Sequence, residues 1–280
     1  MRATQPYAFE PFLFESSCTV FKQMRDTGLQ EAIRAVGGVS ELARRIGISQ
    51  PSVSNWDRIP AERVLTVENA TGINRAILRP DLFGAYAGGD VDETDAARAQ
   101  EYALLAALLA RAPDAALLKR LSELRGDATP LGVAHVALAE AASKTNVERI
   151  EREYFDLFIG IGRGELMPYG SYYLTGFLHE KPLARLRAEL ATLGIERAEG
   201  EVEPEDHAAI LCEIMSGLAS RRLGTHSGAD EKIFDNHLAP WIGRFFNDLE
   251  RADAANFYRS VGALGRVFID IETEAFSLPS

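Results

Sequence analysis

The sequence predicts an all-α protein made of two helical bodies. Apolar residues recur at helical spacing through most of the chain, and alternating runs of β-branched residues are almost absent. A length of 280 residues is enough for two domains, each with its own core. Charge also divides the chain. Residues 1–84 carry 10 basic and 9 acidic side chains, a net +1, whereas residues 85–280 carry 20 and 32, a net −12.

Composition excludes several classes of protein. The acidic second part is unsuited to non-specific nucleic-acid binding and favours a basic partner. Cys18 and Cys212 have neither metal-ligand nor redox spacing, which indicates a reducing compartment, and the histidines show no zinc spacing. No apolar run is long enough to span a membrane. We therefore expect a cytoplasmic protein without membrane insertion, metal or cofactor.

Residues 1–27 form an extension ahead of the first expected helix. It contains the apolar residues 12–14, but it has no basic start and no continuous apolar stretch, so it is not a signal peptide. Two interpretations stay open. The extension is disordered and without structural role, with Met24 as the natural start, or it is a short strap that docks on the body.

Residues 28–84 have the pattern of a helix-turn-helix bundle. Leu29, Ile33 and Val36 fall at helical spacing, and two glycines then end that helix. Ser40 and Ser49 are the expected N-caps of the next two helices, which a glycine turn separates. The helices after the first are expected at about 41–46, 50–56 and 60–70.

The stretch from residue 32 to residue 56 resembles the YdaS/Cro-like family of DNA-binding domains, over residues 28–83. The resemblance implies that the third helix enters the major groove, where Gln and Asn pair with adenine edges and Arg meets phosphates. A palindromic site would call for a homodimer. The alternative is a protein-interaction module, since residues 28–80 carry only seven arginines against five acids. The expected DNA-binding residues are Arg44, Ser49, Gln50, Ser52, Asn55 and Arg58.

Residues 85–95 are rich in glycine and acids and are expected to be a linker to a second domain at 96–276. Apolar periodicity predicts a succession of helices in that domain, forming a compact bundle. The expected ranges are 96–110, 114–125, 130–143, 147–158, 172–179, 182–193, 204–222, 229–248 and 253–273.

Four motifs occur in order within this domain. They are Tyr-Phe-Asp-Leu-Phe-Ile-Gly at 154–160, Pro-Tyr-Gly-Ser-Tyr-Tyr at 168–173, Glu-Pro-Glu-Asp-His at 203–207 and His-Leu-Ala-Pro-Trp at 237–241. Together they resemble the TorD/DmsD/NarJ family of redox-enzyme maturation chaperones, over residues 96–273. The resemblance implies a helical, non-enzymatic domain. It also implies binding of the immature catalytic subunit of a molybdoenzyme, often through its twin-arginine leader, before cofactor insertion and export.

A leader peptide carries arginines and an apolar stretch, so its receptor needs acidic groups beside aromatic walls. The helix expected at 204–222 places Glu205 and Asp206 in its first turn, where the dipole stabilises their charge. It also places Asp206 and Glu213 on one face. The expected client-binding residues are Tyr154, Phe158, Pro168, Tyr169, Ser171, Tyr172, Glu205, Asp206, His207 and Glu213.

Other interpretations of these residues stay open. Four aromatic residues at helical spacing equally suit a core: Tyr154, Phe155, Phe158 and Trp241. His207 equally suits a hydrogen-bonded structural histidine. One alternative function is a DNA-binding transcription regulator whose C-terminal domain senses a ligand or partner. Another is a hydrolase using Asp206 and His207, but no nucleophile lies at a suitable spacing and no phosphate-cradling glycine loop is present.

Overall fold

The computed structural model describes residues 21–23, 26–79, 82, 92–197, 203–223 and 228–278. Within these ranges the protein is helical apart from one two-stranded sheet, which confirms the all-α class. Buried apolar side chains form two separate cores, one within residues 29–78 and one within residues 102–269. The domain boundaries at 84 and 96 stay predictions, because residues 83–91 lie outside the described part.

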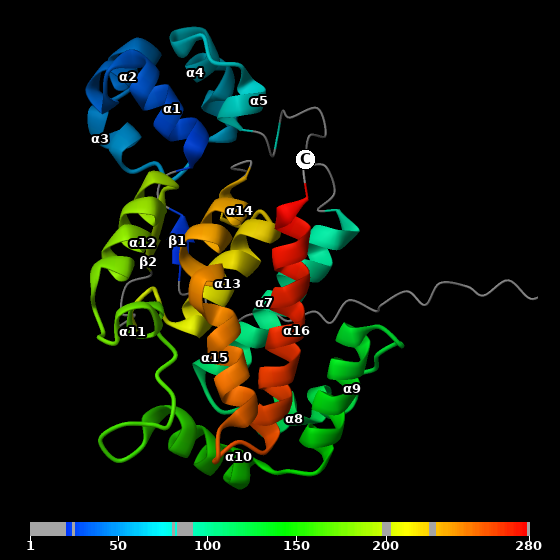
Figure 1. Ribbon diagram of the computed structural model, residues 1–280. Helices are drawn as coiled ribbons and strands as arrows, with labels where there is room; N and C mark the ends of the chain where they lie inside the picture. Colours follow the sequence, from blue (N-terminus) through cyan, green and yellow to red (C-terminus); the bar gives the residue numbers. More distant parts are fainter. Residues whose placement is uncertain are drawn as a thin grey trace, which may run out of the picture.

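The smaller core belongs to the helix-turn-helix body, shown in blue to cyan in Figure 1. Gly37 and Gly47 end α1 and α2 in the left-handed conformation, as the sequence predicts. Ser40 is not a cap, because α2 already begins at Val39 after Gly38. The elements are α1 Thr27–Val36, α2 Val39–Ile46, α3 Gln50–Ser54, η1 Ala61–Arg63, α4 Val64–Thr71 and α5 Arg75–Leu78.

The larger core belongs to the C-terminal body, where α7 packs along α13 and the antiparallel pair α15 and α16 lies beside them (Figure 1). Helix α9 packs on both α8 and α16. Its elements are α7 Glu93–Ala110, α8 Ala115–Ser122, α9 Pro130–Ser143, α10 Val147–Tyr154, η2 Phe155–Ile159, α11 Gly170–Thr175, α12 Lys181–Thr192, β2 Ile195–Arg197, α13 Ala208–Ala219, α14 Ala229–Ile233, η3 Phe234–Leu238, α15 Ala239–Arg251 and α16 Phe257–Ser277.

Several element boundaries differ from the sequence prediction. Helix α7 starts at Glu93 because Asp92 caps it, accepting from Thr94 N at 2.6 Å, so the last residues of the expected linker are helical. The expected helix over 147–158 changes at Phe155 to the wider π-helix η2, where Gly160 N donates to Phe155 O at 2.7 Å. The change turns the chain out of the bundle into an exposed loop.

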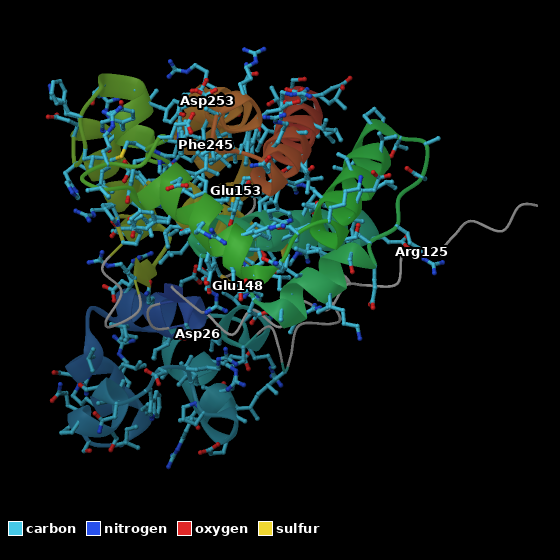
Figure 2. The ribbon with its side chains drawn as sticks, turned by 90° about the horizontal axis from the view of Figure 1, so that it is seen from below. Asp26, Arg125, Glu148, Glu153, Phe245 and Asp253 are labelled. Carbon is cyan, nitrogen blue, oxygen red and sulfur yellow. The ribbon has the colours of Figure 1, made fainter. Side chains whose placement is uncertain are left out.

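Two carboxylates hold that loop region against the turn between α15 and α16. Glu153, labelled on α10 in Figure 2, accepts hydrogen bonds from the backbone N–H groups of Asn256 and Tyr258, both at 2.7 Å. Glu165 accepts from the N–H groups of Asp253 and Ala254. The carboxylates thereby satisfy donors at and before the start of α16, which the helix itself leaves unpaired.

A partly buried ionic cluster joins α7, α14 and α16. The Arg98 guanidinium pairs with Glu272 at 2.9 Å, Asp95 at 2.8 Å and Asp230 at 3.0 Å, and it lies over the ring of Phe276. The Glu272 side chain is only 1% exposed. Neutralisation by Arg98 is what permits this carboxylate in the core.

The sheet was not predicted. Strand β1, Phe21–Gln23, pairs antiparallel with β2, with Phe21 opposite Arg197, Lys22 opposite Glu196 and Gln23 opposite Ile195. Three residues are too few to show an alternating pattern in the sequence. Residues 21–23 of the extension thus contribute a strand, while residues 1–20, with the apolar residues 12–14, lie outside the described part.

Candidate functional site

Two of the predicted motifs meet in one place. The segment that precedes α11 and the segment that precedes α13 form an isolated antiparallel bridge, with Tyr169 opposite His207. Gly170 N donates to Asp206 O and Ala208 N donates to Pro168 O, both at 2.8 Å. The motifs at 168–173 and 203–207 are thus one backbone-linked unit, which we call the motif junction.

At the centre of the motif junction, Asp206 is 3% exposed and Ser171 is fully buried. Asp206 Oδ2 accepts from Ser171 N at 2.7 Å. Among the described residues, Asp206 Oδ1 and Ser171 Oγ have no hydrogen-bond partner. A Cβ on Gly170 would lie 2.9 Å from Trp241 Nε1, so only glycine allows this close approach.

The position of Asp206 corrects the sequence analysis. Helix α13 begins at Ala208 rather than at residue 204, and His207 is its N-cap. Glu205 and Asp206 therefore lie in a turn before the helix, not in its first turn, and Asp206 shares no helix face with Glu213. Pro204 marks the turn that leads into the cap, where His207 N donates to Pro204 O at 3.0 Å.

His207 is a buried, hydrogen-bonded histidine. Its Nδ1 accepts from Ala209 N at 3.1 Å, which places the proton of the neutral ring on Nε2. Burial lowers the pKa of His207 to about 4, although the charge of Asp206 acts in the opposite direction. The ring of Tyr169 packs edge-on at a centroid distance of 5.0 Å. The imidazole is therefore neutral at physiological pH.

The two glutamates of the junction are both engaged. Glu205 is buried and pairs with Arg187 of α12, Nη2 to Oε2 at 2.7 Å. Glu203 Oε1 accepts from Tyr169 Oη at 2.5 Å. Burial first, and then Glu203, raise the pKa of Tyr169 well above its ordinary value. These contacts connect the motif junction to α12 and fix the orientation of the Tyr169 ring.

The aromatic motif mostly packs inward. Tyr154 and Phe158 are half-buried against the core with ring centroids 5.0 Å apart, and both contact the ring of Tyr258. Tyr154 Oη donates to Leu109 O at 3.1 Å, and burial raises the pKa of Tyr154 to about 12. Of the remaining predicted residues, Pro168 is buried, whereas Tyr172 and Glu213 are half-buried.

Several large apolar side chains next to the junction in sequence are exposed, which was not predicted. On the loop after η2, Ile161 is 98% exposed, and after α11 Phe177 is 69% exposed. Arg163 lies 5.9 Å from the ring of Tyr172, so the first of these loops reaches α11. The only sequence signal was apolar residues next to turn glycines. We call these exposed residues together the apolar rim; they are Phe155, Ile159, Ile161, Leu174, Phe177 and Leu178.

The predicted DNA-binding side chains are all exposed on the helix-turn-helix body. Ser49 caps α3 by accepting from Ser52 N at 3.4 Å. Arg44 and Arg58 already have acidic partners: Arg44 pairs with Glu41 at 2.6 Å and Arg58 with Asp26 at 3.2 Å. Hydrogen bonds from Arg44 and then Arg45 lower the pKa of Glu41 to about 2.

The described residues contain no group of three or more His, Cys, Asp or Glu side chains arranged to hold a metal ion. Within the same ranges, no helix is both long and apolar enough to cross a membrane.

Comparison with known families supports both sequence resemblances. Residues 124–247 match the family described as nitrate reductase delta subunit, and residues 29–87 match the family described as bacterial toxin YdaS. The chain therefore joins a YdaS-like helix-turn-helix segment to a TorD-like helical segment.

Individual relatives resemble the second segment. The chaperone protein TorD of Vibrio cholerae is 29% identical over 126 residues, which are 42% of this chain and 57% of the relative. The chaperone protein YcdY of Escherichia coli is 28% identical over 129 residues, 46% of this chain and 66% of the relative. The chain thus spans 57–66% of the length of these curated relatives. A solved structure of a candidate redox enzyme maturation protein from Archaeoglobus fulgidus is 20% identical, with a TM-score of 0.45, over 62% of this chain and 93% of that one.

Proposed function

We propose that the protein is a non-enzymatic cytoplasmic chaperone that holds the immature catalytic subunit of a molybdoenzyme, through its twin-arginine leader, before cofactor insertion and export. Support comes from the TorD-like segment and from relatives that are named chaperones. The residue-level support is the apolar rim, because a chaperone for an unfolded segment must present apolar side chains to solvent.

The apolar rim is the observation that carries the proposal. Ile159 ends η2, Ile161 lies on the loop that follows, and Phe177 follows α11; their side chains are 54%, 98% and 69% exposed. Large apolar side chains that are exposed to solvent are candidate contacts for an apolar segment of a client. Asp156 and Glu180 are exposed acids adjacent to the rim in sequence, and they offer charge to the arginines of a leader.

The buried residues of the motif junction have a supporting role in this proposal. Asp206 and His207 are too buried to make the first contact with a client. They hold Tyr169, Ser171 and the start of α11 in position. Contact of the predicted client-binding residues with a client stays a prediction. Among them, the half-buried rings of Tyr169 and Tyr172 are the best placed to add aromatic area.

Co-purification tests the proposal. The tagged full chain, expressed in its own host, should retain a molybdoenzyme catalytic subunit identified by mass spectrometry. The double variant Ile161→Ser/Phe177→Ser should lose most of that subunit. Val133→Ser/Val136→Ser is the matched control, because these two exposed apolar residues lie on the distant helix α9. Capture of no such subunit, or equal capture by the rim variant, would refute the proposal.

DNA binding by the helix-turn-helix body is a second candidate function, favoured by the exposure of Gln50, Ser52 and Asn55 around α3. In this case Asn55→Ala should reduce sequence discrimination. Arg44→Ala should weaken binding to all sequences alike and lower its salt dependence. A mobility shift with genomic fragments at low salt tests both effects, and no shift by the wild-type chain would exclude the function.

A further inference from the structure

Strand β2 is positioned next to the motif junction. It follows α12 after Gly194, a left-handed residue with φ 67°, and Ile195 is buried at 3% exposure. Arg197 Nη1 donates to Glu203 O at 3.3 Å, which ties the end of β2 to the first residue of the motif. The strand is therefore anchored to the C-terminal body, and β1 pairs with its edge.

The segment that fills this edge comes from far away in sequence. β1 contributes three residues, and the ladder they make with β2 is the only sheet among the described residues. A two-stranded pair of this length is marginal in water. Its main-chain hydrogen bonds are available to any extended segment, because such pairing is largely independent of sequence. β1 is therefore a replaceable occupant.

The register indicates which kind of segment suits the edge. It sets the backbone of residue 22 opposite Glu196, an acid that is exposed on β2. Opposite charges directly across a ladder stabilise strand pairing. An extended segment with a basic residue opposite Glu196 therefore suits this edge, and an arginine-bearing leader has that chemistry.

We propose that the edge of β2 is a docking strand for an extended basic segment of the client, and that β1 fills this edge in the free protein. The proposal rests on the proposed function and adds a binding mode to it. β1 ends three residues before Asp26, which caps α1 by accepting from Gly28 N at 3.0 Å and pairs with Arg58. Release of β1 thus removes the strand that tethers the helix-turn-helix body to the C-terminal body.

A peptide assay tests the docking edge without a client. The probe is a fluorescein-labelled peptide of residues 17–25, with serine in place of Cys18. It should bind a chain that starts at Met24 roughly tenfold more tightly than the full chain, whose tethered β1 competes at high effective concentration. Glu196→Lys in the shortened chain should weaken binding several-fold, while Glu148→Lys, an exposed control on α10, should not.

The backbone contribution is tested by N-methylation of the peptide. Alternate residues of an antiparallel strand direct their N–H groups to the partner. Two peptides are compared, one methylated at Lys22 and one methylated at both Phe21 and Gln23. One of the two should no longer bind, and the other should bind as the unmethylated peptide does. Equal effects of the two patterns, or no binding to the shortened chain with unchanged circular dichroism and melting temperature, would overturn the docking edge.

Client capture separates this proposal from the proposed function. When the amount of the client subunit is limiting, the shortened chain should retain more of it than the full chain does. An excess of the peptide should release the bound subunit. Equal retention without release overturns the strand exchange but leaves the chaperone function intact. If neither chain captures the subunit, the proposed chaperone function is refuted, and the client is then no longer the proposed occupant of the β2 edge. A full-chain dimer in size exclusion, lost on shortening, would instead assign the edge to β1 of a second copy.

Discussion

Removal of the Asp206 carboxylate separates a buried structural role from direct client contact. In Asp206→Ala, the buried N–H of Ser171 loses its acceptor at 2.7 Å. Loss of a hydrogen bond to a charged group at a buried site costs about 2 kcal/mol. For a body of this size, that corresponds to a melting temperature lower by about 4–8 °C. Asp206→Asn keeps an oxygen for Ser171 N, so it should cost less than about 1 kcal/mol.

Urea unfolding followed by tryptophan fluorescence measures this difference. Trp241 is 1% exposed and adjoins Gly170 in the motif junction, so its emission reports the surrounding core. A Trp56→Phe background removes the signal of the helix-turn-helix body. Glu148→Ala is the exposed control. If Asp206→Ala unfolds like the control but binds the client more weakly, the carboxylate acts at the surface and the structural argument is wrong.

Three further predictions concern buried or partly buried ionisable groups. The pKa of His207 is about 4 in the folded state, below its unfolded value, so stability should fall by about 3 kcal/mol as the pH drops from about 6.5 to 4. His207→Gln should flatten this dependence in urea titrations at several pH values. Glu153→Ala leaves the backbone N–H groups of Asn256 and Tyr258 without acceptors and should lower the unfolding free energy by about 3 kcal/mol, more than Glu153→Gln does. Arg98→Met should lower it by about 3 kcal/mol or more, because Glu272 is left buried and unpaired, and adding Glu272→Met should recover most of the loss in calorimetry.

The helices were accessible from sequence because their signals are local. Ser49 is a predicted cap whose side chain accepts from a following backbone N–H group, and the expected helix at 130–143 has the observed bounds. Two ordered sets of motifs were enough for both family resemblances. The sequence allowed two interpretations of Tyr154 and Phe158, burial in the core or contact with a client. Helical spacing alone does not distinguish a core from a binding face.

Tertiary structure decided the roles of the motif residues. The sequence placed Asp206 on a helix, whereas the bridge between Tyr169 and His207 places it in a buried turn. That bridge joins segments 38 residues apart, and the β1–β2 ladder joins segments more than 170 residues apart. Sequence by itself determined the helical class, the two bodies and the motifs, because these depend on spacing along the chain. Burial of Asp206, exposure of Ile161 and occupation of the β2 edge depend on long-range packing, which only the folded chain defines.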